Sequence, residues 1–269
     1  MQLTSLLQLT FLLLYYFLES RLFRFLFKRN LKRVSAGAIS MDWNIVWEHF
    51  PRLLEGLWVT IQITGLGVAI GSVIAVTLAM MQISNVAVLK WSSSMFVLFI
   101  RGTPLLVQLF LIYYGSGQFR QELEAVGLWT YFRETYFCAV LALALNTGAY
   151  SAEIFIGSIK SVDKKQVEAG RAYGMSGFNL YKRIVFPQAL RIAWSAYANE
   201  IIFIMQATSL VSIITLLDLT GIAGQIISRT FAVYEVYIIV ALMYLAFTYS
   251  LIFMFSRIEK YLRRHERVG

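Results

Sequence analysis

Three charged residues, Arg101, Glu153 and Glu200, lie inside long apolar stretches of the sequence. A charge within a membrane is energetically expensive, so such side chains face a protein interior or a water-filled path and commonly pair with one another. Three interpretations stay open. The residues form an Arg–Glu pair that fixes helix packing, a carboxylate lies close enough to the membrane face to stay solvated, or Glu153 or Glu200 attracts the cationic group of a solute.

A polar stripe surrounds one of these carboxylates. Asn146, Tyr150 and Glu153 recur at i, i+4 and i+7, which places them on one face of a helix. Thr147 and Ser151 form a neighbouring pair of the same kind. A polar stripe on an apolar helix faces a partner helix or a water-filled cavity, and hydrogen bonds between helices are compatible with both. The candidate pathway residues are therefore Arg101, Asn146, Tyr150, Glu153 and Glu200.

A proline closely follows the intramembrane arginine. In Arg101-Gly102-Thr103-Pro104, the proline cannot donate the backbone hydrogen bond to the carbonyl of Ile100. We expect the helix to be interrupted at this point. A broken helix can present backbone groups to a cavity within the membrane.

The residues that enzymes and metal sites need are scarce in this sequence. It has one cysteine, Cys138, and two histidines, His49 and His265, which are far apart and have no partner at helical spacing. The three serines at 92–94 have no His or Asp partner in helical register, and the sequence contains no G-x-x-x-x-G-K-[ST] phosphate loop. We therefore predict no metal site, no catalytic residue and no cofactor bound by this chain.

One glycine cluster superficially resembles a dinucleotide-binding motif. Gly65, Gly67 and Gly71 lie within an apolar stretch that has no preceding strand. Small residues at this spacing let membrane helices approach closely. We predict that Gly67 and Gly71 serve helix packing.

The composition indicates a membrane protein. Of 269 residues, 58% are hydrophobic and only 14% are charged, and the mean hydropathy is +0.65. Soluble domains are about 45–50% apolar and about 25% charged. The net charge of +9 would suit nucleic acid, but the cations form short clusters between apolar runs, which is typical of loops at a cytoplasmic membrane face. We predict contact with membrane lipid and not with nucleic acid.

Five apolar stretches after residue 50 are long enough to cross a bilayer, which takes about 20 residues of helix. The unbroken runs argue against the alternation of a β-barrel. The predicted fold is an all-α membrane protein with a five-span core, and the longer connections, Gly115–Tyr136 and Ser209–Glu235, are expected to be loops. The spans are approximately Leu57–Met80, Met95–Tyr114, Phe137–Ile159, Ile192–Gln206 with its flanks, and Val236–Phe255.

The distribution of Lys and Arg predicts the orientation, because cytoplasmic loops carry the excess of cations. The connections on the other side hold only Arg52, Arg120, Arg133 and Arg229. We therefore expect the C-terminus in the cytoplasm and the N-terminus of the core outside. The eleven cations on the predicted inner side are Lys160, Lys164, Lys165, Arg171, Lys182, Arg183, Arg257, Lys260, Arg263, Arg264 and Arg267.

Residues 1–40 do not fit this scheme. An apolar run, Gln8–Leu18 with its neighbours, precedes six cations, and a sixth span would place those cations outside. A signal peptide would carry its basic residues before the apolar run. This N-terminal extension is either an interfacial anchor or the product of an assigned start upstream of the real one, with Met41 beginning the working protein. The second alternative is our hypothesis.

The segment Gln166–Ala189, QVEAGRAYGMSGFNLYKRIVFPQA, carries more pattern than a solvated loop. A helix-prone stretch begins near Glu168, and Gly174 permits a sharp turn. A second short helix with an apolar stripe is expected at about Phe178–Ile184, and Pro187 suits the first turn of the next span. Two short helices across a membrane face form a docking surface rather than a catalytic site.

The same segment resembles the EAA loop of ABC-importer permeases. The family pattern is E-A-A, three residues, G, nine residues, I, one residue, L-P. This sequence keeps the spacing, with Gly170 in place of the third Ala and Phe186 in place of Leu. The resemblance implies that a cytoplasmic loop at about residues 160–187 couples the chain to an ATPase. The implied coupling residues are Glu168, Ala169, Gly170, Arg171, Gly174, Ile184 and Pro187.

Two further stretches resemble the polar amino-acid branch of that family, which includes histidine, arginine, glutamine and opine systems. They are RGTPLLVQLFLIYYG, Arg101–Gly115, and LNTGAYSAEIFIGSIK, Leu145–Lys160. The likeness covers about Trp43–Arg264, so residues 41–269 would form the transmembrane permease domain. It implies a transport subunit of the bacterial inner membrane for polar amino acids, and for basic ones or opines in particular.

The resemblance also implies the partners. A dimer of ATPase subunits would hold ATP and Mg and receive the coupling loop, a second permease subunit, identical or homologous, would complete the pore, and a periplasmic binding protein would deliver the substrate. The alternative is a stand-alone secondary transporter or channel. Such proteins usually have more spans or an internal repeat, and the EAA-like segment favours the importer.

Overall fold

The computed structural model describes residues 42–262 of the chain. The chain divides into two units, Met1–Asn44 and Ile45–Gly269. The predicted extension, residues 1–40, lies outside the described residues. From residue 42 to residue 262 the chain is almost wholly helical and has no strand, which confirms the predicted all-α class.

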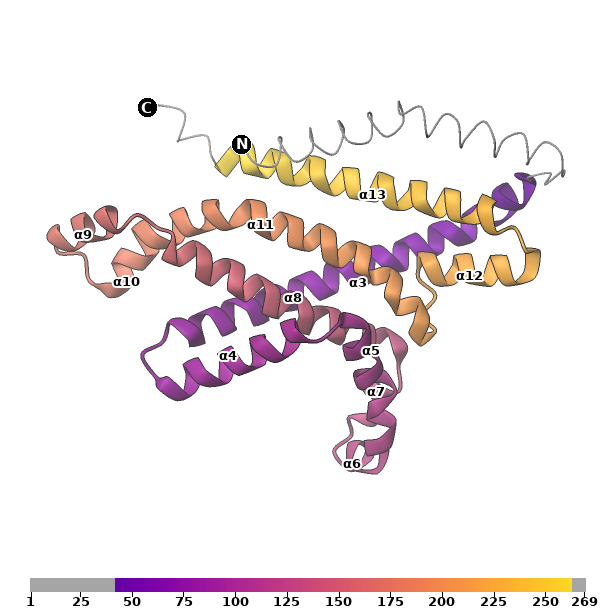
Figure 1. Ribbon diagram of the computed structural model, residues 1–269, viewed down its shortest axis with the longest axis horizontal. Helices are drawn as coiled ribbons and strands as arrows, with labels where there is room; N and C mark the ends of the chain where they lie inside the picture. Colours follow the sequence, from indigo (N-terminus) through magenta and orange to yellow (C-terminus); the bar gives the residue numbers. More distant parts are fainter. Residues whose placement is uncertain (1–41, 263–269) are drawn as a thin grey trace, which may run out of the picture. The chain divides into compact units, whose positions relative to one another are not determined.

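The helices follow one another with short connections (Figure 1). Six of the described helices are short or irregular: two 3₁₀ helices, one π-helical turn, two four-residue helices and one six-residue helix. In chain order the elements are α3 Asn44–Ile83, α4 Ala87–Gly102, α5 Leu105–Tyr113, η1 Gly115–Phe119, α6 Arg120–Ala125, α7 Trp129–Phe132, α8 Thr135–Lys160, α9 Lys164–Ala172, α10 Gly177–Leu180, η2 Tyr181–Val185, α11 Phe186–Ala207, η3 Thr208–Ile214, α12 Leu219–Thr230 and α13 Val233–Leu262.

Four described helices are long and apolar enough to cross a membrane: α3, α8, α13 and the continuous helix Gly177–Ile214. The pair Ala87–Gly102 and Leu105–Ala125 is apolar enough only when taken together, and it is bent by 104° at its break. The described residues thus give four spans, or five when this bent pair is counted as one. Successive spans run in opposite directions, so that α9 and the C-terminal end of α13 lie at one end of the bundle and α12 at the other (Figure 1). Which of the two ends faces the cytoplasm stays a prediction.

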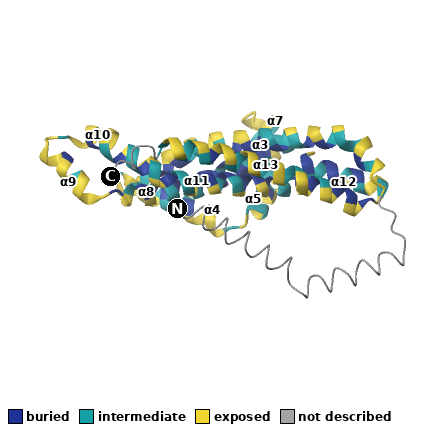
Figure 2. Ribbon diagram, turned by 90° about the horizontal axis from the view of Figure 1, so that it is seen from above, coloured by how far each residue is buried: buried dark blue, intermediate teal, exposed yellow. Residues whose placement is uncertain are grey.

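Helix α8 lies at the centre of the bundle. In its apolar window 67% of the residues are buried, against 17% in α13. Figure 2 shows buried positions where the described helices overlap and exposed positions on the outer faces. Ile63 of α3, Leu109 of α5 and Leu143 of α8 belong to one core cluster. Since lipid is as apolar as these side chains, close packing rather than exclusion of water holds the helices together.

Glycines bring α3 against α8, as the sequence predicts. A Cβ on Gly71 would lie 2.8 Å from Cβ of Thr147 and 3.0 Å from the carbonyl oxygen of Ala144. A Cβ on Gly67 would lie 3.1 Å from Cβ of Leu143. Only a residue without a side chain permits this approach.

Three expectations about local structure are wrong. The stretch Phe178–Ile184 is not a separate helix, because it continues into α11 through the π-helical turn Tyr181–Val185. In that turn the N–H of Phe186 bonds to the carbonyl of Tyr181, and the wider turn accommodates Pro187, which has no N–H to donate. The two connections expected to be loops are also mostly helical: η1, α6 and α7 occupy Gly115–Tyr136, and η3 and α12 occupy Ser209–Glu235.

Candidate functional site

The predicted break beside Arg101 is present. Helix α4 ends at Gly102, α5 begins at Leu105, and Pro104 occupies the extended position between them. The carbonyl of Ile100 loses its helical partner to the proline. It accepts instead from the N–H of Thr103 at 3.5 Å, a long hydrogen bond, and from a side chain on α5.

That side chain is Gln108, which the sequence analysis missed. Its Nε2 donates to the carbonyl oxygen of Ile100 at 2.7 Å and to that of Thr103 at 3.0 Å. Its Oε1 accepts from Nδ2 of Asn146 on α8 at 3.2 Å. The side chain is buried, so it ties both sides of the break to the central helix. A lone amide in an apolar run, four residues after a proline that frees a carbonyl, was the available signal.

Arg101 contacts the polar stripe of α8. Its Nη1 lies 3.4 Å from Oε2 of Glu153, and its guanidinium carbon lies 5.3 Å from the centre of the Tyr150 ring. Of the three open interpretations, the structure shows the Arg–Glu pair for Arg101 and Glu153. Both side chains keep about two fifths of their surface exposed, 42% for Arg101 and 41% for Glu153, so the pair faces out of this chain.

Glu200, on α11, forms no ion pair within the described residues. Its Oε1 is buried and has no hydrogen-bond partner among the described residues, although the charge of Arg101 acts on it. The hydroxyls of Thr147 and Ser151 are buried and unpartnered in the same way. Of the five candidate pathway residues, four thus meet at the broken helix, and Glu200 is the carboxylate that no ion pair occupies.

At the predicted cytoplasmic end, α9 has a residue suited to each terminus. The carboxylate of Asp163 accepts from the N–H of Lys165 at 3.0 Å, which caps the first turn. Gly174 has φ +75°, a left-handed conformation that glycine adopts without strain. The N–H groups of Gly174 and Met175 bond to the carbonyls of Arg171 and Gly170. The sequence therefore fixes both ends of this nine-residue helix.

Gly170 is buried against the start of the next span. A Cβ there would lie 2.6 Å from Cδ1 of Ile184 and 2.6 Å from Cδ1 of Leu180. The space that the third alanine of the EAA pattern would need is filled here by these two side chains. Ile184 thus holds α9 against the bundle, and Pro187 lies farther along the same helix, in the first turn of α11.

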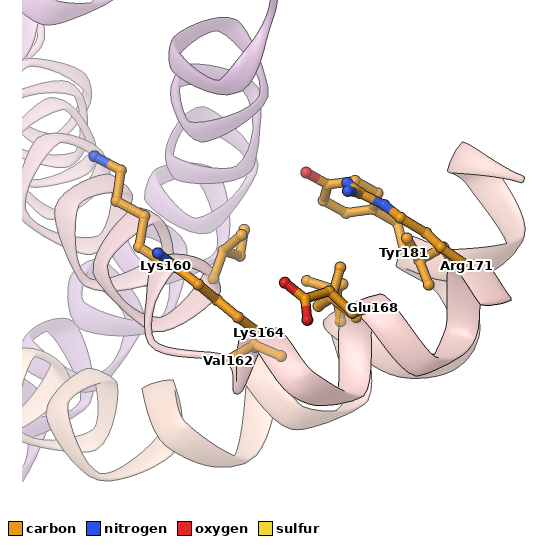
Figure 3. A pocket seen from close by; sticks show the side chains of 10 residues that line it. Lys160, Val162, Lys164, Glu168, Arg171 and Tyr181 are labelled. Atoms are coloured by element: carbon orange, nitrogen blue, oxygen red, sulfur yellow. The ribbon is translucent and has the colours of Figure 1, made fainter. Parts of the chain in front are cut away.

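The charges of α9 divide between two faces. Lys164, Glu168 and Arg171 line a cleft of about 310 Å³ between α9 and the start of helix Gly177–Ile214 (Figure 3). Lys165 and Ala169 are exposed and do not line the cleft. In the described part of the chain no ion pair involves Glu168. The predicted coupling residues therefore come together, with Ala169 on the outermost face and Glu168 in the cleft.

A buried carboxylate at the other end of the bundle was also missed. Asp218 caps α12: its Oδ1 accepts from the N–H of Gly221 at 2.8 Å, and its Oδ2 accepts from the hydroxyl of Tyr244 at 3.4 Å. Burial raises the pKa of Asp218 to about 6, although these hydrogen bonds lower it. The N–H of Leu219 donates to Oγ1 of Thr60, which fastens α12 to α3. The signal was an Asp directly before the apolar helical pattern.

The comparison with protein families decides the class. The family described as "Binding-protein-dependent transport system inner membrane component" matches residues 67–264. This chain belongs to that family.

Several curated permeases are similar to this chain over most of their length. The nopaline transport system permease protein of Agrobacterium fabrum is 47% identical over 227 residues, 84% of this chain and 94% of that protein. The octopine transport system permease protein of Rhizobium meliloti is 42% identical over 80% of this chain and 87% of that protein. The histidine/lysine/arginine/ornithine transport system permease protein of Escherichia coli K12 is 40% identical over 82% and 92%.

Solved structures share the fold. One chain of the crystal structure of an amino acid ABC transporter with histidines matches with a TM-score of 0.74 and 34% identity, and covers 82% of this permease and 99% of that chain. A chain of the inward-facing MetNI methionine ABC transporter matches with a TM-score of 0.66 over 80% of this permease and 98% of that chain. Its identity is 18%, so that likeness concerns the fold alone.

The family confirms the predicted class and location. This chain is a multi-pass permease subunit of an ABC importer in the inner membrane, and ATP hydrolysis belongs to a separate ATPase subunit. An ATPase and a substrate-binding protein are its partners as a member of this family. The alternative of a stand-alone secondary transporter is therefore set aside.

Proposed function

We propose that this permease imports basic amino acids or opines, and that Glu200 attracts the cationic group of the substrate. The names of the similar permeases support the substrate class. The observation that carries the assignment of Glu200 is its free buried oxygen, since the other candidate, Glu153, is occupied by Arg101. A carboxylate without a partner at membrane depth is a functional site by default.

Neutral substitutions of the two glutamates test this assignment. Glu200→Gln is expected to lower the uptake of radiolabelled arginine at least about 10-fold, because one buried charge pair with the substrate is lost. Glu153→Gln is the matched variant and is expected to alter uptake less, through the position of Arg101. Unchanged uptake by Glu200→Gln, with normal protein levels in the membrane, would remove Glu200 from the path.

The polar pair that faces out of the chain supports a second permease subunit as partner. Arg101 and Glu153 are each about 40% exposed, and a charge pair at this depth does not face lipid. A second subunit, identical or homologous, would cover this side and share the path. Co-purification of differently tagged copies tests the identical case, and recovery of one tag alone, with a homologous permease, favours the other.

We further propose that α9 is the element that receives a dimer of ATPase subunits. Its caps, its glycine contact with Ile184 and its free charges support this role. A rigid helix with unpaired charges at the end of two spans can transmit a push from a bound partner to those spans. The coupling residues would be those of the EAA pattern, with Arg171 beside them.

A charge reversal separates coupling from folding. Glu168→Lys is expected to lower uptake at least about 10-fold, because it removes the single acid of the cleft and adds a fourth cation there. Glu122→Lys, the same change at an exposed position of α6, is the control and should leave uptake unchanged. Wild-type uptake and ATPase association in Glu168→Lys would defeat the assignment.

A further inference from the structure

Two aromatic side chains anchor helix α11 to its neighbours. The Nε1–H of Trp194 donates to the carbonyl oxygen of Phe255 on α13 at 3.2 Å, and the hydroxyl of Tyr197 bonds to Oγ of Ser72 on α3. The Tyr197 ring also lies against that of Phe155 on α8, with 5.4 Å between the ring centroids. Tyr197 therefore joins α11 to both α3 and α8.

The direction of the bond between Tyr197 and Ser72 follows from the donors available. A serine hydroxyl has one hydrogen, and that of Ser72 is donated to the carbonyl oxygen of Val68, one turn earlier on α3, at 2.6 Å. Ser72 therefore accepts the second bond, and the hydroxyl of Tyr197 donates it. A phenylalanine at position 197 would keep the ring contacts and lose only this bond.

Ser72 lies beside a close contact between α3 and α8. The preceding residue, Gly71, approaches α8 so closely that a Cβ there would lie 2.8 Å from Cβ of Thr147. Interfaces packed this tightly are not continuously deformable, so two such helices move together or change between discrete arrangements. We therefore treat α3 and α8 as one unit, to which Tyr197 fastens α11.

The other end of α11 is continuous with the coupling segment. Helix Gly177–Ile214 runs from α10 through α11, and Nε2 of Gln188 donates to Oε1 of Gln166 on α9. In the described chain, Tyr197 is the last side chain of α11 that hydrogen-bonds another span, and Glu200 follows it by about one turn. A displacement of α9 therefore reaches Tyr197 before it reaches Glu200.

We propose that Tyr197 is a positioning residue of the transport cycle. Through Ser72 it holds α11 in register with the unit of α3 and α8, so that movement of the coupling segment acts on the turn that carries Glu200. Without this bond α11 yields by itself, and the ATPase hydrolyses ATP without moving the path. The inference rests on the proposed coupling through α9 and names the contact that transmits it within the bundle.

ATP hydrolysis by the purified permease–ATPase complex, without substrate or binding protein, tests the proposal. Tyr197→Phe and Ser72→Ala are each expected to raise this uncoupled hydrolysis at least about 3-fold, because one hydrogen bond between helices is lost. The double variant should hydrolyse ATP no faster than either single variant, since all three lack the same bond.

Two variants on α13 control for the chemical changes. Tyr249→Phe removes the hydroxyl of an exposed tyrosine. Ser250→Ala removes a hydroxyl that donates to the carbonyl oxygen of Ala246 within its own helix, as Ser72 does to Val68. Both controls should keep the wild-type rate of hydrolysis.

Three outcomes would overturn the proposal. The first is unchanged hydrolysis in Tyr197→Phe when the complex assembles normally. The second is additive effects in the double variant, which would give Tyr197 and Ser72 separate roles. The third is a lower melting temperature with unchanged hydrolysis, which would make the contact merely structural. Because the readout needs no substrate and uses an assembled complex, its failure leaves the experiments on Glu200 and Glu168 to be judged by themselves.

Discussion

Two polar regions of this permease, the broken helix beside Arg101 and helix α9, differ in whether the chain itself pairs their charges. At the broken helix, Arg101 pairs with Glu153, and Gln108 satisfies the freed carbonyl of Ile100. On α9 the charges of Glu168 and its neighbours have no ion pair in the described chain. Within lipid no water satisfies a polar group, so the chain must do so itself. At the membrane face water hydrates the charges of α9, so these charges remain available to bind a partner protein.

The largest effect is expected from removing the internal partner of the break. Gln108→Leu leaves the carbonyl of Ile100 and the amide of Asn146 without their side-chain partner, which costs about 1–3 kcal/mol of stability for a buried group. Thermal unfolding of the purified permease in detergent measures the loss. Gln118→Leu, at an exposed position of η1, is the control. Equal melting temperatures would show that the break does not depend on this clamp.

A smaller, pH-dependent effect is expected at Asp218. Its pKa is raised from 3.8 to about 6 by burial, so between these values the folded state binds more protons than the unfolded state, and stability falls as pH rises. Above about pH 7 the contribution of Asp218 should be constant. Asp218→Asn keeps an acceptor for the N–H of Gly221 and should make this slope shallower by the contribution of Asp218. A variant that retains the wild-type slope in melting temperature between pH 4.5 and pH 7 would exclude Asp218 as its source.

The smallest effect is expected from an ion pair that faces water. Arg120 and Glu124 lie 2.8 Å apart on α6, and both side chains are largely exposed. Exposed pairs at i, i+4 contribute about 0.3–0.5 kcal/mol. Arg120→Gln should therefore leave the melting temperature almost unchanged in 0.5 M salt, where the wild-type pair is already screened. A loss comparable to that of Gln108→Leu would contradict the distinction between the two environments.

Much of the fold follows from the sequence because each span must be a long apolar helix. The break at Pro104, the packing of Gly71 against α8 and the turn at Gly174 each follow from one residue type with one physical property. The helical continuity from Gly177 into α11 does not. Proline usually begins a helix, and the alternative of a π-helical turn depends on the packing of Leu180 and Val185 against the bundle.

The candidate site was predictable in its members but not in its pairing. Asn146, Tyr150 and Glu153 share a face by periodicity, yet only the folded chain distinguishes the carboxylate that Arg101 occupies from the free one on Glu200. Gln108 was missed because a single amide in an apolar run carries no periodic signal. Its role depends on a carbonyl eight residues earlier that the 104° bend brings within reach.

A single-cysteine experiment tests most directly whether α9 meets an ATPase in the cytoplasm. Cys138 is the only cysteine of the sequence and is fully buried, so the background is low. The probe is attached at two exposed positions. One is Tyr173→Cys next to α9, where the native residue is 88% exposed, and the other is Val126→Cys after α6, where the native residue is 67% exposed. In intact cells opened only at the outer membrane, an impermeant maleimide should label Val126→Cys and not Tyr173→Cys, and a thiol photocrosslinker on Tyr173→Cys should capture the ATPase. Labelling of Tyr173→Cys from outside, or no crosslink to the ATPase, would contradict the assignment.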